Sequence, residues 1–513
     1  MTAFLKNISG KTGSFCSGLS FFSAFLIFYA ILLLRDSAFL FSPPHWDEII
    51  GVHNQALFLL KHNFDFSELW SSAQHCYEGS NVYPLSLIPV LYACLYAVLP
   101  PEWVHFAGHL LNHACIAGSA ACFFLILREK FELSGTASIL WSLAFLAEPL
   151  LSGRAAALDL EAPMICAVSV SFLLVSGKKY FPALAVLLFS GFLKPSSAVV
   201  SLAFLLTELV FLIRERREWK KHLPTVLGAG ICFLILFLMT AHHVPVSASG
   251  IHTASQNGLA RDGGNSVFLF LCRKLIFHYE LYFPVLLSVT AAGAVLSSIQ
   301  LIKDRDREKF GFQLLLLLTA GGYVLAYLIA KTALPRYLSA AVFPAYLLLA
   351  SNWKWKAKPF AILMILIGLT APFFYKQLPF GIRRSGEYLE RSRAFLYDIA
   401  ANRRLCRFLE THRDHPIVAP WPIVQMLTMP EMGYVRSPFP KVYSGLVPFY
   451  APVKKLDLPL EKMPDDTIFV YQENDWETTC RSNPCLRPGR DTITIWKDST
   501  LGGLTLVYRR NKF

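Results

Sequence analysis

Charged residues are scarce in this chain of 513 residues. They make up 16% of it, whereas an average soluble domain carries about 25%. Hydrophobic residues make up 54%, and the mean hydropathy is +0.44. Runs such as 21–34 and 312–330 approach or reach the roughly 20 apolar residues that cross a bilayer. No small-residue cleavage site follows the first run, so we expect a retained span and an integral membrane protein.

The net charge of +13 does not indicate a nucleic-acid partner, because the basic residues are confined to short loops between apolar runs. These loops are Arg214–Lys221, Lys303–Lys309 and Lys354–Lys358. Such clusters are typical of cytoplasmic loops under the positive-inside rule. Membrane orientation therefore explains most of the charge, and the lipid bilayer is the partner it indicates.

The apolar pattern predicts a helical bundle of about 11 (11–13) transmembrane helices. The candidate spans are 17–40, 82–99, 104–127, 135–151, 156–176, 181–197, 198–213, 223–241, 280–302, 311–330, 337–351 and 360–375. The basic loops place 41–81, 242–275 and the tail on the outer side, which requires an odd number of crossings. One candidate must then fail to cross. We expect it to be the short segment 135–151, with a helix broken at Lys194-Pro195 as the alternative.

The spans stop near residue 375, which predicts a membrane domain over 1–375 and an outer α/β domain over 376–513. Strand-like runs within the second part are "TIFVYQ", "DTITIW" and "LTLVYRR". Most of the 11 cysteines lie inside apolar runs, as inert packing residues do. Cys480 and Cys485 lie close together in a polar segment and could form a disulfide in an oxidising compartment.

Acidic residues flank the first outer loop, 41–81. Asp47 and Glu48 follow the first span, and "IIGVHNQALFLLKHN" after them predicts an amphipathic helix in the membrane interface. Helix capping is an equally good explanation of Asp47. Tyr77 and Glu78 close the same loop, where a solvated acid is the ordinary expectation.

Ionisable residues also stand at the edges of later spans. Such groups are costly in a membrane and are usually paired or functional. Arg154 and Asp159 could form a structural ion pair, and the spacing of Asp159 and Glu161 could suit a divalent cation, a weak metal signal to which His243 of the outer loop could add a ligand. The cations are Lys194, Lys331 and Arg336, the last followed by Tyr337; they could bind phosphate or anchor the interface.

The order of these motifs resembles the polyprenol-phosphate-sugar-dependent membrane glycosyltransferases of the GT-C fold, the family of aminoarabinose transferases and protein O-mannosyltransferases. The likeness covers about residues 17–350. It matches Asp47 to the essential acid of the family's first outer loop and Tyr77-Glu78 with Pro84-Leu85 to its second motif. It also matches Arg154 with Asp159, and Pro335-Arg336-Tyr337. The family's lysine after the second acid is absent, so Lys194, Lys331 or Arg336 would replace it.

The resemblance implies transfer of a sugar from a polyprenyl-phosphate donor to a lipid, glycan or protein acceptor, with no certain cofactor. Asp47 would be the general base, and Glu48 belongs to the same catalytic acid pair. The location implied is a bacterial inner membrane with the site on the periplasmic side. A lipid-linked-sugar transporter, an oligosaccharyltransferase-like enzyme and a non-catalytic assembly subunit are the alternatives; inverted repeats, which mark many transporters, are not evident.

Overall fold

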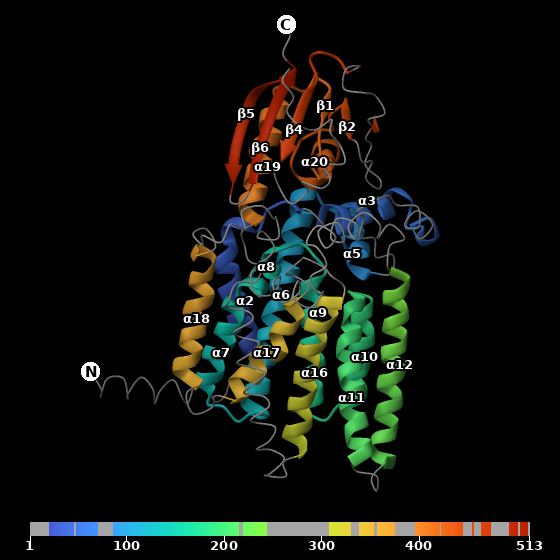
Figure 1. Cartoon of the computed structure of the whole chain (residues 1–513), viewed down its shortest axis with the longest axis vertical. Coiled ribbons are helices and arrows are strands. Elements are labelled where there is room, and N and C mark those ends of the chain that lie inside the picture. The colour runs from blue at the N-terminus through green and yellow to red at the C-terminus, as the bar shows by residue number, and fades with distance from the viewer. Residues whose placement is uncertain are drawn as a thin grey trace, which may run out of the picture.

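The computed structural model consists of an apolar helical bundle with a smaller sheet-containing part stacked on one end (Figure 1). We call the smaller part, residues 395–510, the C-terminal region. We call the end of the bundle beneath it the covered end. The structure describes residues 20–45, 48–69, 86–214, 219–243, 307–329, 338–352, 357–374, 395–420, 422–444, 454–455, 463–472, 492–500 and 503–510.

Five described helices are long and apolar enough to cross a membrane, or six if a pair bent by 68° counts as one span. The described part of the chain therefore has the helices of an integral membrane protein. The helices are α2 (Phe21–Asp36), α5 (Leu87–Val98), α6 (Pro101–Glu129), α7 (Gly135–Ala147), α8 (Pro149–Ala156), α9 (Glu161–Ser176), α10 (Tyr180–Gly191), α11 (Ala198–Arg214), α12 (Trp219–His243), α16 (Arg307–Ile329), α17 (Ser339–Asn352) and α18 (Ala357–Phe374).

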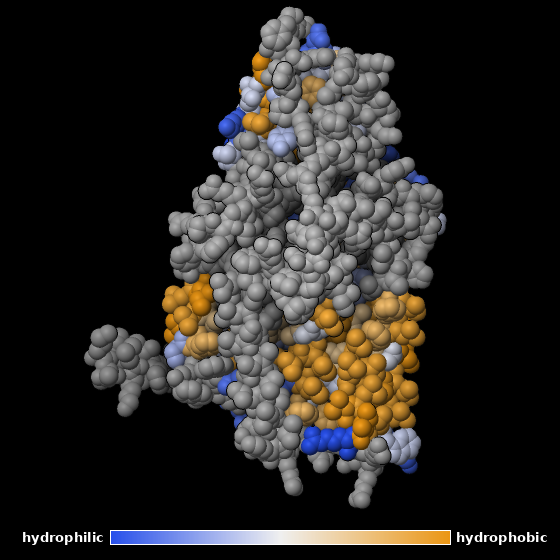
Figure 2. All heavy atoms as spheres, viewed as in Figure 1, coloured by the Kyte–Doolittle hydropathy of each residue, from blue (hydrophilic) through white to orange (hydrophobic). Residues whose placement is uncertain are grey.

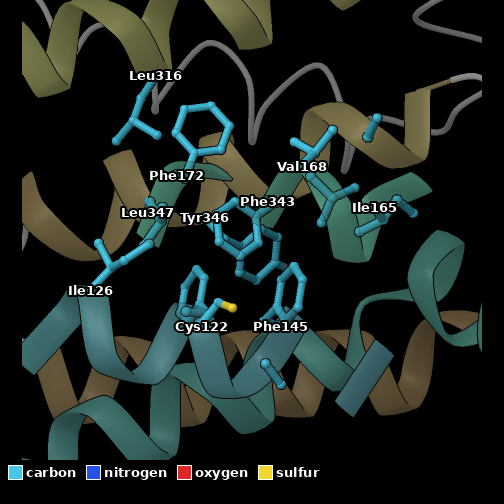
Figure 3. Packing of buried hydrophobic residues seen from close by; sticks show 14 of the residues in the cluster. Cys122, Ile126, Phe145, Ile165, Val168, Phe172, Leu316, Phe343, Tyr346 and Leu347 are labelled. Atoms are coloured by element: carbon cyan, nitrogen blue, oxygen red, sulfur yellow. The ribbon is translucent and has the colours of Figure 1, made fainter. Parts of the chain in front are cut away.

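Aromatic side chains fill the centre of the bundle (Figure 3). The ring of Phe123 on α6 stacks on Phe145 of α7 at 5.0 Å between centroids, and Phe343 of α17 meets both edge-on. Offset stacking and edge-to-face contacts of this kind add to the burial energy. The outer surface is apolar as well, and Figure 2 shows a hydrophobic face over the helices. Helices apolar on all sides are expected where lipid replaces water.

Segment 135–151, the candidate expected to fail as a span, forms α7 and α8, which are bent by 68° against each other as in a broken span or a re-entrant loop. Its failure to cross stays a prediction. At the covered end Arg35 donates to the Leu146 carbonyl at 3.2 Å, whereas near the start of α7 Glu132 pairs with Lys309 at the opposite end. The predicted alternative was a helix broken at Lys194-Pro195, and there α10 and α11 are separate helices that meet at the short helix η3 (Pro195–Ser197).

Helix α5 is the candidate that stays at one end. Its first amide, of Leu87, donates to the Phe192 carbonyl at 2.8 Å beside η3. Near its other end, the Tyr96 hydroxyl donates to the Glu431 carbonyl of the C-terminal region at 3.4 Å. Both of its ends thus lie at the covered end. Its 12 residues rise about 18 Å, as do the 12 residues of α10, so these contacts rather than its length place α5 at that end.

The loop after the first span does form a helix, as expected, and its place in the membrane interface stays a prediction. A single 3-10 turn η1 (Ser37–Phe39) is followed by a π-helical turn η2 (Glu48–His53) and by α3 (Asn54–Lys61). Residues 54–59 are all buried. Leu57 packs with the C-terminal region, whereas Ala56 and Leu59 pack with α5. The polar side chains of Asn54 and Gln55 are therefore covered by protein, whereas Lys61 at the end of the helix is exposed.

The C-terminal region is a mixed sheet with helices, which agrees with an α/β arrangement. Its sheet has the order β3-β2-β1-β4-β6-β5, parallel from β3 to β4 and antiparallel from β4 to β5. The three predicted runs are strands β4, β6 and, with a bulge near Trp496, β5. The elements are α19 (Phe395–Glu410), β1 (Ile417–Val418), α20 (Ile423–Thr428), η8 (Pro430–Met432), β2 (Val442–Ser444), β3 (Lys454–Lys455), β4 (Ile468–Gln472), β5 (Thr492–Thr500) and β6 (Gly503–Arg510).

Candidate functional site

Two buried ion pairs meet at the covered end of the bundle. Arg154, near the end of α8, pairs with Asp159, and Lys194, after α10, pairs with Glu161 at the start of α9. All four side chains are at most 8% exposed. Asp159 joins the two pairs, because its Oδ1 accepts the Glu161 amide at 3.1 Å. The four predicted residues therefore form one cluster.

The local sequence explains why these side chains face one another. Asp159, two residues before the first residue of α9, accepts the Glu161 amide, and Glu161 in the first turn complements the helix dipole. Helix α10 ends near Gly191, where the Lys194 amide still donates to Ser190 at 2.8 Å before Pro195 stops the helix. The start of α9 and the end of α10 thus bring Glu161 and Lys194 together.

Glu48, the first residue of η2, lies beside this cluster. Its carboxylate accepts the His45 amide at 2.7 Å and an amide of Leu158. Burial and, second to it, the charge of Asp159 raise the pKa of Glu48 to about 8, against the opposing effects of its hydrogen bonds and of the charge of Arg154. Glu48 is therefore mostly protonated near pH 7.

With Glu48 protonated, the two acids of the ion pairs balance the two cations. A buried set of charges without net charge is tolerable in low dielectric only when it is paired in this way. An anionic or hydroxyl-rich ligand arriving here would meet guanidinium and ammonium donors together with carboxylate acceptors. These are the groups that bind phosphate and sugar hydroxyls.

Several predicted site residues lie outside the described residues. These are Asp47, Tyr77, Glu78, Lys331, Arg336 and Tyr337, together with Cys480, Cys485 and the side chain of His243. Their roles and the disulfide stay predictions. The described cysteines, Cys94, Cys115, Cys122, Cys166, Cys232 and Cys406, are free.

The structure lends no support to the predicted metal site in the part of the chain that it describes. Among those residues, no three His, Cys, Asp or Glu side chains gather to hold a metal ion. Asp159 and Glu161 each contact a cationic side chain instead. A metal there would have to displace Arg154 or Lys194 from its carboxylate, so the Asp159–Glu161 site stays an untested prediction.

The sequence reasoning missed a cluster of buried histidines beside the site. His105, His109 and His113 are spaced four residues apart on α6 and all are buried. His113 faces Asp36 at 2.8 Å, and His53 faces the Tyr96 hydroxyl at 2.7 Å. Burial lowers the pKa of His53 well below its usual value, with His105 and His109 adding to the effect, so His53 is neutral. Ionisable side chains at helical spacing within an apolar run were the available signal.

Comparisons with known proteins give limited guidance. No protein-family model matches the chain, and no curated protein matches its sequence. The chain is similar to the crystal structure of ArnT from Cupriavidus metallidurans bound to undecaprenyl phosphate, with 14% identity and a TM-score of 0.48 over 94% of this chain and 97% of that one. The apo ArnT structure gives 14% and 0.46 over 93% and 97%.

Proposed function

We propose that the protein is a membrane glycosyltransferase that moves a sugar from a polyprenyl-phosphate donor to a lipid, glycan or protein acceptor. The reaction takes place on the outer face of a bacterial inner membrane, at the covered end of the bundle. Two lines support the proposal. One is the order of motifs along the sequence; the other is the cluster of Glu48 with the two buried ion pairs.

The cluster is the observation that carries the proposal. Breaking a buried ion pair by removal of one partner is strongly destabilising, and replacing both by apolar residues is often neutral or better. A chain that keeps two such pairs side by side, next to a protonated acid, therefore has a use for them beyond stability. Their place at the ends of α8, α9 and α10 suits a lipid phosphate held near the membrane surface.

In the proposed reaction, the acceptor hydroxyl attacks the anomeric carbon of the donor sugar. The bond from that carbon to the phosphate oxygen breaks, and its electron pair leaves with the polyprenyl phosphate. Asp47 takes the hydroxyl proton as general base, and the direct displacement inverts the anomeric centre. An uncharged Glu48 adds no repulsion to an ionised Asp47.

Binding of the donor is assigned to the remaining site residues. Asp159, with Glu78 and Tyr77, holds the sugar, and Arg154 orients Asp159. Lys194 binds the departing phosphate together with Lys331 or Arg336, flanked by Tyr337, because fixed cations stabilise the charge that develops there.

The location of the cluster argues against the transporter alternative. Many secondary transporters bind substrate near the bilayer midplane, in helices broken at matching positions of two repeats. Here all four paired residues lie at helix ends at the covered end of the bundle. Among the described residues, the helices bent at a short break are α7 and α8, a single pair without a matching second one. A surface reaction fits this placement better than passage through the middle.

The test uses purified full-length protein, a panel of polyprenyl-phosphate sugars and native membrane extract as the source of acceptor. Release of polyprenyl phosphate is measured for the unmodified protein, Asp47→Asn and the control Asp65→Asn. Asp65 is an exposed acid of the same loop, and asparagine keeps its ability to cap a helix. We expect release from the unmodified and control proteins and none from Asp47→Asn.

Two results would contradict the proposal. Undiminished release by folded Asp47→Asn would remove Asp47 from its assigned role. If no donor in the panel is consumed by folded protein in lipid, monosaccharide transfer fails, and oligosaccharide donors followed by transport assays are the next experiments.

A further inference from the structure

We propose that Asp398, on α19 of the C-terminal region, is a positioning residue for the site: through His45 it fixes the turn that presents Glu48. Its effect on turnover rests on the function proposed above, whereas the clamp on the turn does not. Asp398 lies 350 residues from Glu48 in sequence, and no sequence motif singles it out.

The link begins with a buried contact between the two parts of the molecule. The His45 ring nitrogen Nε2 lies 2.6 Å from Oδ2 of Asp398, and both side chains are at most 6% exposed. Asn402, one turn later on α19, donates to the same oxygen at 3.4 Å. Asp398 is therefore held in place from its own helix while it contacts His45.

The turn from His45 to Glu48 is closed by two hydrogen bonds. The Glu48 amide donates to the His45 carbonyl at 2.9 Å, and the His45 amide donates to the Glu48 carboxylate at 2.7 Å. The backbone of His45 thus fixes the acid whose protonation responds to the charges of Asp159 and Arg154. Asp47, which lies outside the described residues, falls between the two ends of this turn in sequence.

Three further contacts attach the same segment to the C-terminal region. Arg403 of α19 donates to the Phe41 carbonyl at 3.0 Å, and the Tyr434 hydroxyl donates to the Pro44 carbonyl at 3.0 Å. Ile49, the residue after Glu48, is fully buried in the apolar core of the C-terminal region. Phe41, Pro44 and Ile49 are therefore attached to the C-terminal region, although they precede α3 in the chain.

Simple packing of two parts would also bury these residues, so the experiment must separate packing from positioning. A positioning role predicts that loss of the Asp398 carboxylate loosens residues 42–50 and lowers turnover while binding of the donor is kept. A misplacement of about 1 Å can cost up to about 100-fold in rate. Simple packing predicts a lower melting temperature with turnover per folded molecule unchanged.

The test compares Asp398→Asn, His45→Gln and the double variant in lipid nanodiscs. Two readouts are taken: hydrogen–deuterium exchange of peptides covering 42–50, and kcat and KM for the donor. The control is Asp466→Asn, which removes another Asp–His contact of the same region, to His415 at 3.1 Å. We expect faster exchange in each single variant and a kcat lowered roughly 10-fold or more at little change in KM. The double variant should be no worse than the stronger single one.

Unchanged exchange in Asp398→Asn would overturn the clamp. Faster exchange with unchanged kcat, or an additive loss in the double variant, would overturn the positioning role. If unmodified protein turns over no donor, the proposed function fails, while exchange alone still decides the clamp. If Asp398→Asn does not fold, Tyr434→Phe is used instead. This variant removes the hydroxyl that donates to the Pro44 carbonyl, and it too must speed hydrogen–deuterium exchange of residues 42–50.

Discussion

The ion pairs at the two ends of the bundle differ in how far their side chains are exposed to water. At the end opposite the C-terminal region, Glu308 lies 2.5 Å from Lys178 and 3.8 Å from Lys130, and Glu132 lies 3.2 Å from Lys309. The side chains of Lys178 and Glu308 are about 60% exposed. At the covered end, Arg154–Asp159 and Lys194–Glu161 are nearly inaccessible to water.

The difference in exposure sets what each pair can contribute. Exposed pairs are worth about 0–1 kcal/mol, because water and salt screen the attraction. Buried pairs lose the hydration of both charges, and their mutual attraction has to offset that loss. Pairs at the opposite end fit a solvated loop surface, whereas those at the covered end need another reason, which the proposed donor site supplies.

The largest effect should come from breaking a buried pair. Arg154→Met leaves Asp159 without its guanidinium partner in a buried position, which typically costs about 3–5 kcal/mol. Thermal unfolding of the purified protein in nanodiscs should show a much lower melting temperature. The matched change Lys178→Met at the opposite end should shift it little. Equal shifts would contradict the contrast between the two ends.

A double replacement sharpens the same comparison. Replacing both partners by apolar residues, as in Arg154→Met with Asp159→Leu, removes the buried charges together. We expect much of the lost stability to return, since apolar replacements of buried pairs are often neutral. Polyprenyl phosphate release should stay absent. If release of polyprenyl phosphate returned together with stability, the Arg154–Asp159 pair would have a structural role only.

The next effect concerns the acid beside the pairs and depends on pH. Glu48 has a folded-state pKa of about 8, above its ordinary value. Its proton stabilises the folded state fully below the unfolded pKa, and this contribution falls by about 1.4 kcal/mol per pH unit until pH passes about 8. The side-chain amide introduced by Glu48→Gln does not titrate, so it stays uncharged at every pH. The melting temperature of this variant relative to the unmodified protein should therefore rise between about pH 5 and pH 8.

The control for Glu48 is Glu68→Gln, an acid of the same loop whose side chain is 46% exposed. It should follow the pH dependence of the unmodified protein. If Glu48→Gln follows it as well, then Glu48 is not held protonated in the folded state.

The apolar pattern predicted the bundle well, because a helix in lipid is read directly from a run of apolar residues. It failed at α5, whose composition equals that of a span. What keeps α5 at one end is tertiary: hydrogen bonds from Ser86 and Leu87 to residues 192–193, and from Tyr96 to Glu431. Composition carries no information on such contacts. Length does not separate α5 from α10 either, since both have 12 residues.

The site was predictable in part for a similar reason. Arg154, Asp159, Glu161 and Lys194 were visible as charges at the edges of apolar runs, where they are costly. The ion pair of Arg154 with Asp159 could be predicted because the two residues are close in sequence. The pair of Glu161 with Lys194 could not, because these residues are far apart in sequence, near the ends of different helices. Asp398 lies on an ordinary amphipathic helix, so its contact with His45 required the three-dimensional structure.

A smaller effect should come from the contact between the C-terminal region and the bundle. Gly433 has φ of +75°, a conformation that disfavours other residues, and an added Cβ would lie 3.0 Å from the His105 ring. Gly433→Ala should therefore destabilise the protein by about 1–2 kcal/mol. Gly321→Ala on α16, where a Cβ meets nothing within 4 Å, should instead raise the melting temperature slightly. A neutral Gly433→Ala would mean that the two parts are less tightly docked than the structure has them.

The smallest effect should come from the exposed end, and its dependence on salt makes it informative. Glu308→Gln removes the acid shared by Lys178 and Lys130 and should lower stability by less than about 1 kcal/mol. At about 1 M salt the Debye length falls to about 3 Å, so even this loss should vanish. The loss in Arg154→Met should persist, because ions do not reach a buried pair. A salt-sensitive loss at Arg154 would show that water and ions enter the covered end, and the cluster would then bind its ligand as an open surface site rather than a desolvated one.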